Sequence, residues 1–336
     1  MSERDPNEAA RDGRARVQVV REDAIRALVD LDVEGLDAVR EALRRLSAGD
    51  AVQPPVMRID VPEHRGEVDV KGAYLRGLDS FAVKMSSGFF DNPGRGLPTS
   101  SGLMVLLSAE TGVPRAVLLD NGYLTDVRTA LAGAVAADAL ARADIDTAAV
   151  LGAGAQARWQ LRALLLVRRP RRALVWARRR AEAERLAGEM SASLGIPVEA
   201  VEEAERAVAG SDLVLTTTPA TEPILEAEWL QPGVHVTAMG SDSEHKQELE
   251  PAVLARADVV VSDRRSQGLA IGELRAARAA GVDVSEARVA ELGEVLAGTR
   301  EGRTSDEQIT VCDLTGTGVQ DTAIARLAYA RANRRA

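Results

Sequence analysis

Cysteine, histidine and aromatic residues are all scarce in this chain of 336 residues. Cys312 is the only cysteine, which excludes a disulfide framework and a cysteine-based metal site. The only histidines are His64, His235 and His245, and no Gly-x-Ser-x-Gly motif occurs. We therefore expect neither a serine or cysteine nucleophile with a histidine base nor a metal centre.

Long apolar runs and an excess of positive charge are also missing. No stretch approaches the length of a membrane span, and the first residues lack the apolar segment of a secretory signal. The formal net charge of −9 disfavours binding to nucleic acid or to an anionic membrane surface. These absences predict a cytoplasmic protein with no nucleic-acid or membrane partner. The polar, charged residues 1–15 are expected to form a disordered tail.

Lysine is rare although positive charge is not. The chain has 42 lysines and arginines together, yet Lys71, Lys84 and Lys246 are its only lysines. A surface cation in this chain is usually an arginine, so each lysine is a candidate for chemistry. An ordinary surface position remains the alternative for each of them.

The order of the apolar patterns predicts two domains. Between residues 53 and 120, short strand-like runs separated by Gly, Pro and Asn predict a mainly antiparallel sheet, after a helix over 36–46. A further helix is expected over 123–140. Strands and helices then alternate, which indicates a parallel sheet with helices on both faces. These parallel strands are expected at 147–151, 173–177, 197–201, 212–217, 234–238, 258–261 and 309–313.

The predicted fold class is therefore α/β. A Rossmann-type, doubly wound parallel sheet forms one domain, and a mainly antiparallel α+β domain precedes it. The last strand, 309–313, is followed by a helix to about residue 332 that could rejoin the first domain.

A glycine-rich turn follows the first parallel strand. Gly152, Gly154 and Ala157 form a Gly-x-Gly-x-x-Ala fingerprint between a strand and a helix, the context that dinucleotide binding requires. Gly152 would make the turn, Gly154 would let a pyrophosphate approach, and the helix that includes Ala155 and Gln156 would offer its amide N–H groups. A purely structural turn in an alanine-rich chain is the alternative.

Polar residues follow the next parallel strands. Arg178 and Arg179 stand where a carboxylate would bind the ribose of NAD, so we expect NADP(H), with NAD(H) possible. A solvated arginine face is the alternative. Further cofactor contacts are expected from residues that follow two later strands: Thr217, Thr218, Pro219, Met239 and Gly240. Asp242 is a candidate acid/base group or, equally, the N-cap of a following helix.

Three cations lie in apolar surroundings ahead of the fingerprint. Arg58 and Lys84 are within strand-like runs, and Arg128 is in an apolar helix. A buried cation needs a partner. Together they could hold a substrate carboxylate, or each could form a salt bridge to an internal acid.

The ordered set of motifs resembles the ornithine cyclodeaminase/mu-crystallin family over nearly the whole chain. The motifs are Phe81–Lys84, Leu124–Thr129, Gly152–Gln156, Thr237–Asp242 and Gly316–Asp321. Two further stretches, Ser87–Pro93 and Leu119–Leu124, are similar to the ectoine-utilisation cyclodeaminase-like branch and the related iminosuccinate reductases of β-hydroxyaspartate metabolism.

The resemblance implies a two-domain homodimer. Residues 16–125 and 315–336 would bind substrate and dimerise, and residues 126–314 would form the dinucleotide-binding domain. Arg58, Lys84 and Arg128 would hold the substrate α-carboxylate, and Asp242 would handle the proton on the substrate nitrogen. The loop 316–321, including Gly318, would close near the nicotinamide.

The family hosts several activities, so the substrate is open. We expect hydride transfer from NAD(P)H to an α-imino acid, with iminosuccinate giving L-aspartate. Ornithine cyclodeamination is the second hypothesis, and a non-enzymatic NADPH-dependent binder like mu-crystallin is the third.

Alternation along 67–71 puts Asp69 and Lys71 on one face of a strand. Asp69 would suit an ornithine ammonium, whereas Lys71, Arg95 or His245 would suit a second carboxylate. An exposed Asp69–Lys71 surface pair is the alternative.

Overall fold

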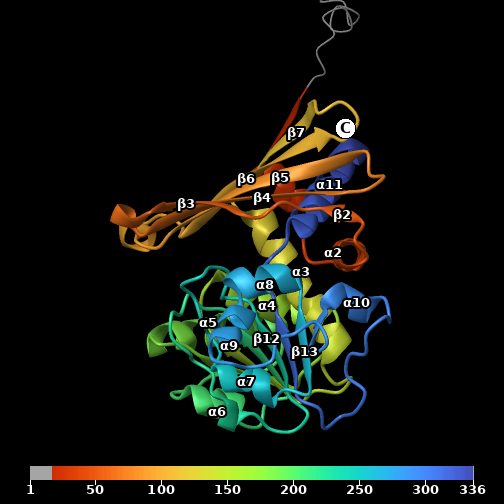
Figure 1. The fold of residues 1–336 in the computed structure, drawn as a ribbon. Coiled ribbons are helices and arrows are strands. Elements are labelled where there is room, and N and C mark those ends of the chain that lie inside the picture. Colours follow the sequence, from red (N-terminus) through yellow and green to blue (C-terminus); the bar gives the residue numbers. More distant parts are fainter. Residues whose placement is uncertain (1–16, 336) are drawn as a thin grey trace, which may run out of the picture.

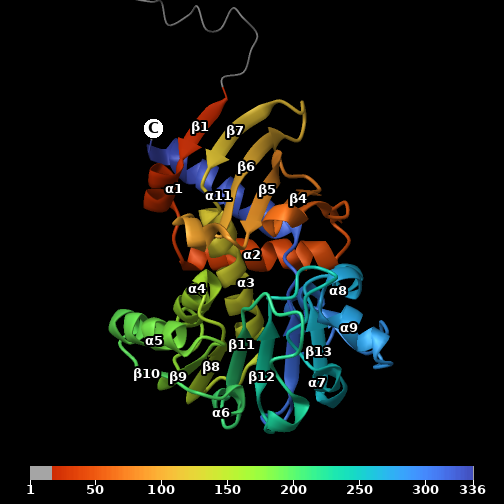
Figure 2. The same cartoon turned by 90° about the vertical axis from the view of Figure 1, so that its left-hand side faces the viewer.

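The computed structural model describes residues 17–335, so the predicted tail lies outside the described residues. Two sheets dominate the molecule, one above the other in Figure 1 and Figure 2. The upper sheet is mainly antiparallel and the lower one is parallel, which confirms the predicted fold class. Within the described residues, no helix is both long and apolar enough to cross a bilayer.

The upper sheet has the order β1-β7-β6-β5-β4-β2, with β3 paired to β4, and only β1 and β7 pair in parallel. Its strands are β1 (Gln18–Arg21), β2 (Ala51–Val52), β3 (Met57–Val61), β4 (Gly66–Leu75), β5 (Ser80–Phe89), β6 (Ser100–Ser108) and β7 (Pro114–Leu119). Alternate residues such as Ala82, Leu106 and Leu118 are buried on one face. Helices α1 (Glu22–Leu28), α2 (Val33–Ser47) and α11 (Gly318–Arg335) pack on this domain.

The lower sheet has eight parallel strands in the order β10-β9-β8-β11-β12-β15-β13-β14. They are β8 (Thr147–Leu151), β9 (Arg172–Trp176), β10 (Val198–Ala200), β11 (Leu213–Thr216), β12 (His235–Ala238), β13 (Val259–Ser262), β14 (Val289–Glu291) and β15 (Thr310–Asp313). The connecting helices are α4 (Ala155–Leu164), α5 (Arg180–Leu194), α6 (Ala204–Val208), α7 (Pro251–Arg256), α8 (Arg265–Ile271), α9 (Glu273–Ala279) and α10 (Leu292–Leu296). The sequence did not predict β14 or α8 to α10.

The chain crosses between the sheets twice. Helix α3 (Tyr123–Leu140) runs from the upper domain onto the lower sheet, and its small residues allow close packing. A Cβ at Gly133 would lie 2.0 Å from the side-chain amide of Gln160 of α4, so a larger residue there would have to displace that amide. On the return, β15 lies between β12 and β13 and leads into α11 of the upper domain.

A second close approach joins the domains directly. Helix α10 packs against α2, and a Cβ at Gly293 would lie 2.1 Å from the carbonyl oxygen of Leu43. The two domains are therefore fixed against each other at this contact as well as through α3.

Candidate active site

The carboxyl ends of the central parallel strands meet at one edge of the lower sheet. The register pairs Thr216 of β11 with Leu151 of β8 and with Ala238 of β12, and Ala238 with Asp313 of β15. The loops that follow these strands therefore lie side by side below the upper domain. The order of an open α/β sheet reverses at β8 and β11, and such switch points form ligand crevices.

The glycine turn after β8 has the geometry of a dinucleotide cradle. Gly152 has φ 128°, and a Cβ there would lie 2.4 Å from Thr217 Oγ1. A Cβ at Gly154, by contrast, would meet no atom within 4 Å, which leaves room for a ligand. No side chain caps the amino end of α4 at Gly154, so its amide N–H groups remain available to a phosphate. These residues fit a dinucleotide.

Three other predicted cofactor residues, Ala155, Gln156 and Gly318, differ in their surroundings. Ala155 is exposed beside this cradle, whereas the Gln156 amide donates to Asp126 Oδ1 at 2.8 Å and joins α4 to α3. Gly318 is buried, and a Cβ there would lie 2.6 Å from the backbone of Gly72 in β4. Close packing of α11 on the sheet is therefore sufficient reason for glycine at 318, and its predicted contact with the cofactor stays a prediction.

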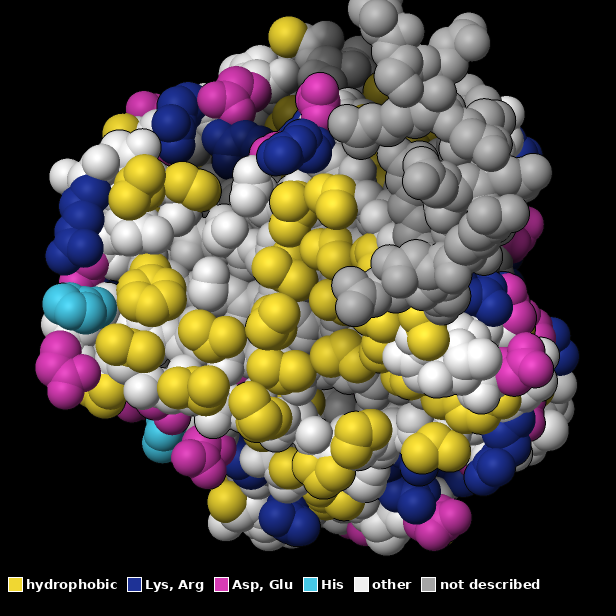
Figure 3. All heavy atoms as spheres, turned by 90° about the horizontal axis from the view of Figure 1, so that it is seen from above, with side chains coloured by type: hydrophobic (Ala, Val, Ile, Leu, Met, Phe, Trp, Pro, Cys, Tyr) yellow, Lys and Arg dark blue, Asp and Glu magenta, His cyan; other side chains and the backbone are white. Residues whose placement is uncertain are grey.

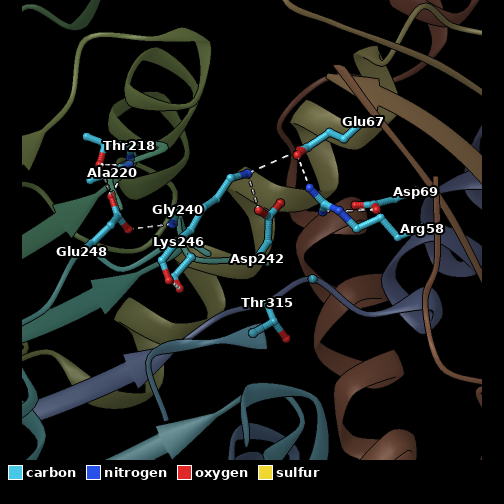
Figure 4. Close-up of polar contacts among 12 residues, drawn as sticks. Arg58, Glu67, Asp69, Thr218, Ala220, Gly240, Asp242, Lys246, Glu248 and Thr315 are labelled. Carbon is cyan, nitrogen blue, oxygen red and sulfur yellow. Dashed lines mark hydrogen bonds and ion pairs between the residues drawn. The ribbon is translucent and has the colours of Figure 1, made fainter. Parts of the chain in front are cut away.

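Glu248 organises the two loops beside the cradle (Figure 4). Its carboxylate accepts hydrogen bonds from Thr216 Oγ1 at 2.6 Å, from Thr218 N and Oγ1 at 2.5 and 2.8 Å, and from Gly240 N at 2.7 Å. Burial raises the pKa of Glu248 above its ordinary value, against these hydrogen bonds. Sequence reasoning missed this residue. The neighbouring Pro219 is exposed at the same edge.

Arginines follow β9 as the sequence predicts. Arg178, Arg179 and Arg180 are all exposed. Arg179 pairs with Glu182, and Arg180 pairs with Glu184 at 2.8 Å. This arrangement is compatible with both readings of the arginine run, a phosphate site and a solvated face.

A small cavity, open to solvent, lies between the two sheets. Lys71, Arg128, Met239 and Asp242 line it, so the structure brings together predicted substrate and cofactor residues from both domains. Its remaining lining residues are Thr129, Ala132, Leu314, Thr315, Gly316 and Gln320.

Lys84 and Arg128 share one buried counterion. Lys84 Nζ lies 3.1 Å and Arg128 Nε 3.0 Å from Asp321 Oδ1, in the first turn of α11. Lys84 is 1% exposed and is not among the residues that line the cavity. Burial, followed by the charge of Arg128, lowers the pKa of Lys84 to about 7, despite Asp321. Both predicted roles, salt bridge and carboxylate grip, remain compatible with this cluster.

Arg58 lies in a mostly exposed strand, which corrects the expectation of an apolar run. Met57 and Ile59 beside it are 54% and 49% exposed. Its guanidinium contacts Asp60 at 2.9 Å, Asp69 at 3.5 Å, and Glu67. Arg58 thus forms the salt bridges of the alternative reading and is not among the residues that line the cavity, and its contact with the substrate carboxylate stays a prediction.

Asp242 faces a cation that the sequence analysis did not assign. Lys246 Nζ lies 2.7 Å from Asp242 Oδ1 and 3.4 Å from Glu67 Oε1 of β4 (Figure 4). The N-cap alternative for Asp242 is wrong, because residues 241–250 form turns and no helix. Burial opposes ionisation of Asp242, but Lys246 and Lys71 outweigh it, and its pKa lies below the ordinary value.

Lys71 and Asp69 point to the buried face of β4, as the alternation predicts. They are 6% and 7% exposed, so the reading of an exposed surface pair is wrong. Within residues 17–335, the hydrogen-bond partners of Lys71 Nζ are the carbonyl oxygens of Thr315 and Gly316, each at 3.4 Å. His245 is exposed beside Glu244, and Arg95 is exposed in a loop of the upper domain.

Fold and site together indicate a dinucleotide-dependent enzyme of the Rossmann type, with a cavity between its two sheets. The chain belongs to the ornithine cyclodeaminase/mu-crystallin family, whose model matches residues 17–336. This family membership confirms the expected class of enzyme, an NAD(P)-dependent oxidoreductase that acts on carbon–nitrogen bonds. A protein of Sinorhizobium fredii named an uncharacterized cyclodeaminase is 53% identical over 320 residues, 95% of this chain and 97% of its own.

Solved structures agree over nearly the full length. The Δ1-pyrroline-2-carboxylate reductase of Thermococcus litoralis, in complex with NADH and L-proline, matches with a TM-score of 0.89 at 31% identity, over 95% of this chain and 98% of that one. An archaeal alanine dehydrogenase dimer with bound NAD has a TM-score of 0.87 at 34% sequence identity. The iminosuccinate reductase of Paracoccus denitrificans with NAD+ has a TM-score of 0.86 at 31% sequence identity. Both cover 95% of this chain and 97% of their own.

Proposed function

We propose that this protein is an NAD(P)H-dependent imine reductase that converts iminosuccinate to L-aspartate. The observation that carries the proposal is the cavity in which Lys71 and Arg128 meet Asp242 at the cofactor edge of the parallel sheet. Relatives of similar fold act on small imino or amino acids, as their names state. The resemblance to ectoine-utilisation proteins suggests that the substrate arises in (hydroxy)ectoine or hydroxyaspartate catabolism.

The residues have distinct tasks in this reaction. The dinucleotide supplies a hydride for the imine carbon. Arg128 holds the α-carboxylate, and Lys84 supports this grip through the counterion Asp321 that the two cations share. Asp242 accepts a hydrogen bond from the protonated imine nitrogen, and as a carboxylate it favours the cationic form that accepts hydride best. Such positioning can supply about 7–11 kcal/mol in ideal cases.

The charges of the cavity favour a substrate with two carboxylates. Lys71, Lys84 and Arg128 are opposed nearby by Asp321 and by Asp242, which lines the same cavity and whose pKa Lys71 lowers. Among the described residues, Lys71 donates hydrogen bonds to two carbonyl oxygens at 3.4 Å and to no carboxylate, so its ammonium can also bind a carboxylate of the ligand. Asp69, the residue that would bind an ornithine ammonium, already contacts Arg58. The cyclodeaminase alternative is therefore the less supported one.

NADP(H) is the proposed cofactor, with Arg178 and Arg179 at the 2′-phosphate. Both are exposed at the carboxyl end of β9, next to the Gly152 turn, whose amide donates to Trp176 O at 2.8 Å. Arginine is suited to such a phosphate. The similar structures contain NAD or NADH, so NAD(H) remains the alternative.

The outer face of the upper sheet is the proposed dimer interface. Figure 3, a view from above, shows hydrophobic side chains gathered on this face. Val19, Met57, Ile59 and Met85 are 41–55% exposed, although a soluble surface would normally be polar there. The alanine dehydrogenase of similar fold is a dimer.

A nicotinamide-absorbance assay tests the proposal. Oxaloacetate plus ammonium should consume NAD(P)H faster than pyruvate plus ammonium, and ornithine with NAD(P)+ should release no ammonia. Asp242→Asn should bind cofactor normally and lose most turnover. Ammonia release from ornithine would assign the chain to the cyclodeaminases, and tight binding without any turnover would favour a binding protein.

A further inference from the structure

Lys246 forms a bridge between the two domains that the reaction scheme above does not use. It lies on the loop after β12 in the lower domain, and its side chain is 12% exposed. Its ammonium lies 2.7 Å from Asp242 and 3.4 Å from Glu67 of β4 (Figure 4). It also lies 5.6 Å from the ring centre of Phe90. A surface lysine would be free of such contacts, so this residue has a specific environment.

The two carboxylates differ in what else they contact. Glu67 is also an ion-pair partner of Arg58, whereas Lys246 is the cation nearest to Asp242. The two contacts of Lys246 are unequal in length, so a small movement of its ammonium group would exchange one for the other. A cationic nitrogen beside Asp242 would repel Lys246 toward Glu67.

We propose that Lys246 is a positioning residue for Asp242. It holds Asp242 as a carboxylate aimed at the domain boundary, and it moves to Glu67 when a protonated substrate nitrogen takes its place. This inference rests on the proposed function of Asp242. Through its contact with Glu67 of β4, Lys246 thereby links the protonation state of Asp242 to the upper, substrate-binding domain.

Other cations near Asp242 act in the same direction as Lys246 but from farther away, whereas the Glu67 carboxylate on the other side of Lys246 opposes ionisation. Lys71 of β4 and Arg58 of β3 both favour its ionised form, and Arg128 of α3 lines the same cavity. Lys246 has the largest electrostatic effect among them, and it alone forms a hydrogen bond with Asp242. Removing its charge should therefore change the proton affinity of Asp242 most.

The test is a titration of Asp242 by carbon-13 NMR of labelled carboxyl groups, with Asp242→Asn to assign its signal. Lys246→Gln should raise the pKa of Asp242 by at least about one unit, a tenfold change in proton affinity. Lys246→Arg should restore it. The acidic limb of the kcat/KM profile should move by the same amount, while NAD(P)H affinity and melting temperature stay close to those of the unmodified protein.

Arg65→Gln is the control, because Arg65 is an exposed cation of the upper domain that contacts Asp91 instead of Asp242. It should leave the Asp242 titration unchanged. Glu67→Gln should raise KM for the imino acid, since Lys246 then has no second carboxylate. An unchanged Asp242 pKa in Lys246→Gln would overturn the inference. Normal turnover by Asp242→Asn would overturn the proposed role of Asp242 instead, so the two failures are distinguishable.

Discussion

Lys71 and Lys84 lie directly opposite each other on the neighbouring antiparallel strands β4 and β5, and both side chains are buried. Like charges in this position destabilise a sheet. Asp321 compensates Lys84 and Arg128, but it does not contact Lys71. Lys71 also favours the ionised form of Asp242 in the same cavity, and the second carboxylate of a bound dianion would offset its charge further.

This pair leads to the first prediction. Lys71→Ala should raise KM for iminosuccinate by about tenfold or more, the value of a charged hydrogen bond of about 1.5–3 kcal/mol. It should change KM for iminopropionate little, and melting should show no loss of stability. Asp69→Ala is the comparison and should do little damage. The reverse pattern, with Asp69→Ala abolishing ammonia release from ornithine, would contradict a dianion site.

The pKa of Lys84 predicts proton uptake on ligand binding. It is lowered to about 7 from 10.5, so at pH 8 most of the free protein carries a neutral Lys84. A bound carboxylate favours the charged form of Lys84 and so raises its pKa. Ligand binding should therefore be accompanied by proton uptake at Lys84 between about pH 7 and pH 10.5, and by no uptake below about pH 7, where Lys84 is already charged. Calorimetry with succinate at pH 8, in buffers of different ionisation enthalpy, measures this uptake. Lys84→Arg stays charged and should show none; equal uptake by both proteins would refute the assignment.

Cofactor preference gives a third prediction. Arg178→Ala should weaken NADPH binding about tenfold or more and leave NADH binding nearly unchanged, because only NADPH has the 2′-phosphate. The control is Arg171→Ala, an equally exposed arginine before the amino end of β9. Fluorescence titration of both cofactors decides the question. Equal affinities in the unmodified protein would show that the arginine run is only a solvated face.

His235 predicts acid sensitivity of the fold. Its ring lies between Thr310 Oγ1 and Thr237 Oγ1, each at 2.8 Å, and burial, followed by the charge of Arg303, lowers its pKa to about 3. Below about pH 6.5 His235 binds a proton in the unfolded chain but stays neutral in the folded protein. The free energy of unfolding therefore falls as the pH drops from about 6.5 toward 3.

The slope should be about 1.4 kcal/mol per pH unit, or about 2 kcal/mol lost by pH 5. Urea unfolding at pH 7.5 and at pH 5 measures it. His235→Gln should lower stability at both values but reduce the difference between them. If the difference persists in full, other groups cause the acid sensitivity.

Local signals predicted much of the fold. The Gly152 turn, β8 and α4 form where expected, because apolar run, glycine pair and helix former are adjacent in the sequence. The end of α5 at Gly195, with φ 69°, is equally local. By contrast, the strand order that places β15 between β12 and β13 depends on contacts between distant segments.

In the site, too, contacts between residues distant in the sequence could not be predicted. The sequence singled out Lys71, Arg128 and Asp242, which the structure brings to one cavity. It could not show that Asp321 pairs with Lys84, that Glu67 reaches Lys246, or that Glu248 joins two loops, because these partners are far apart in the chain or lack a motif. The rarity of lysine was the only signal for Lys246.

The late position of β15 has a consequence for biosynthesis. An interior strand of the parallel sheet and a helix of the other domain both come from residues 310–335. Neither domain can complete its folding on the ribosome until this segment has emerged, because the position between β12 and β13 stays unfilled until β15 is synthesised. Truncation before residue 310 should therefore abolish both domains together, and neither half should be obtainable as an independently folding fragment.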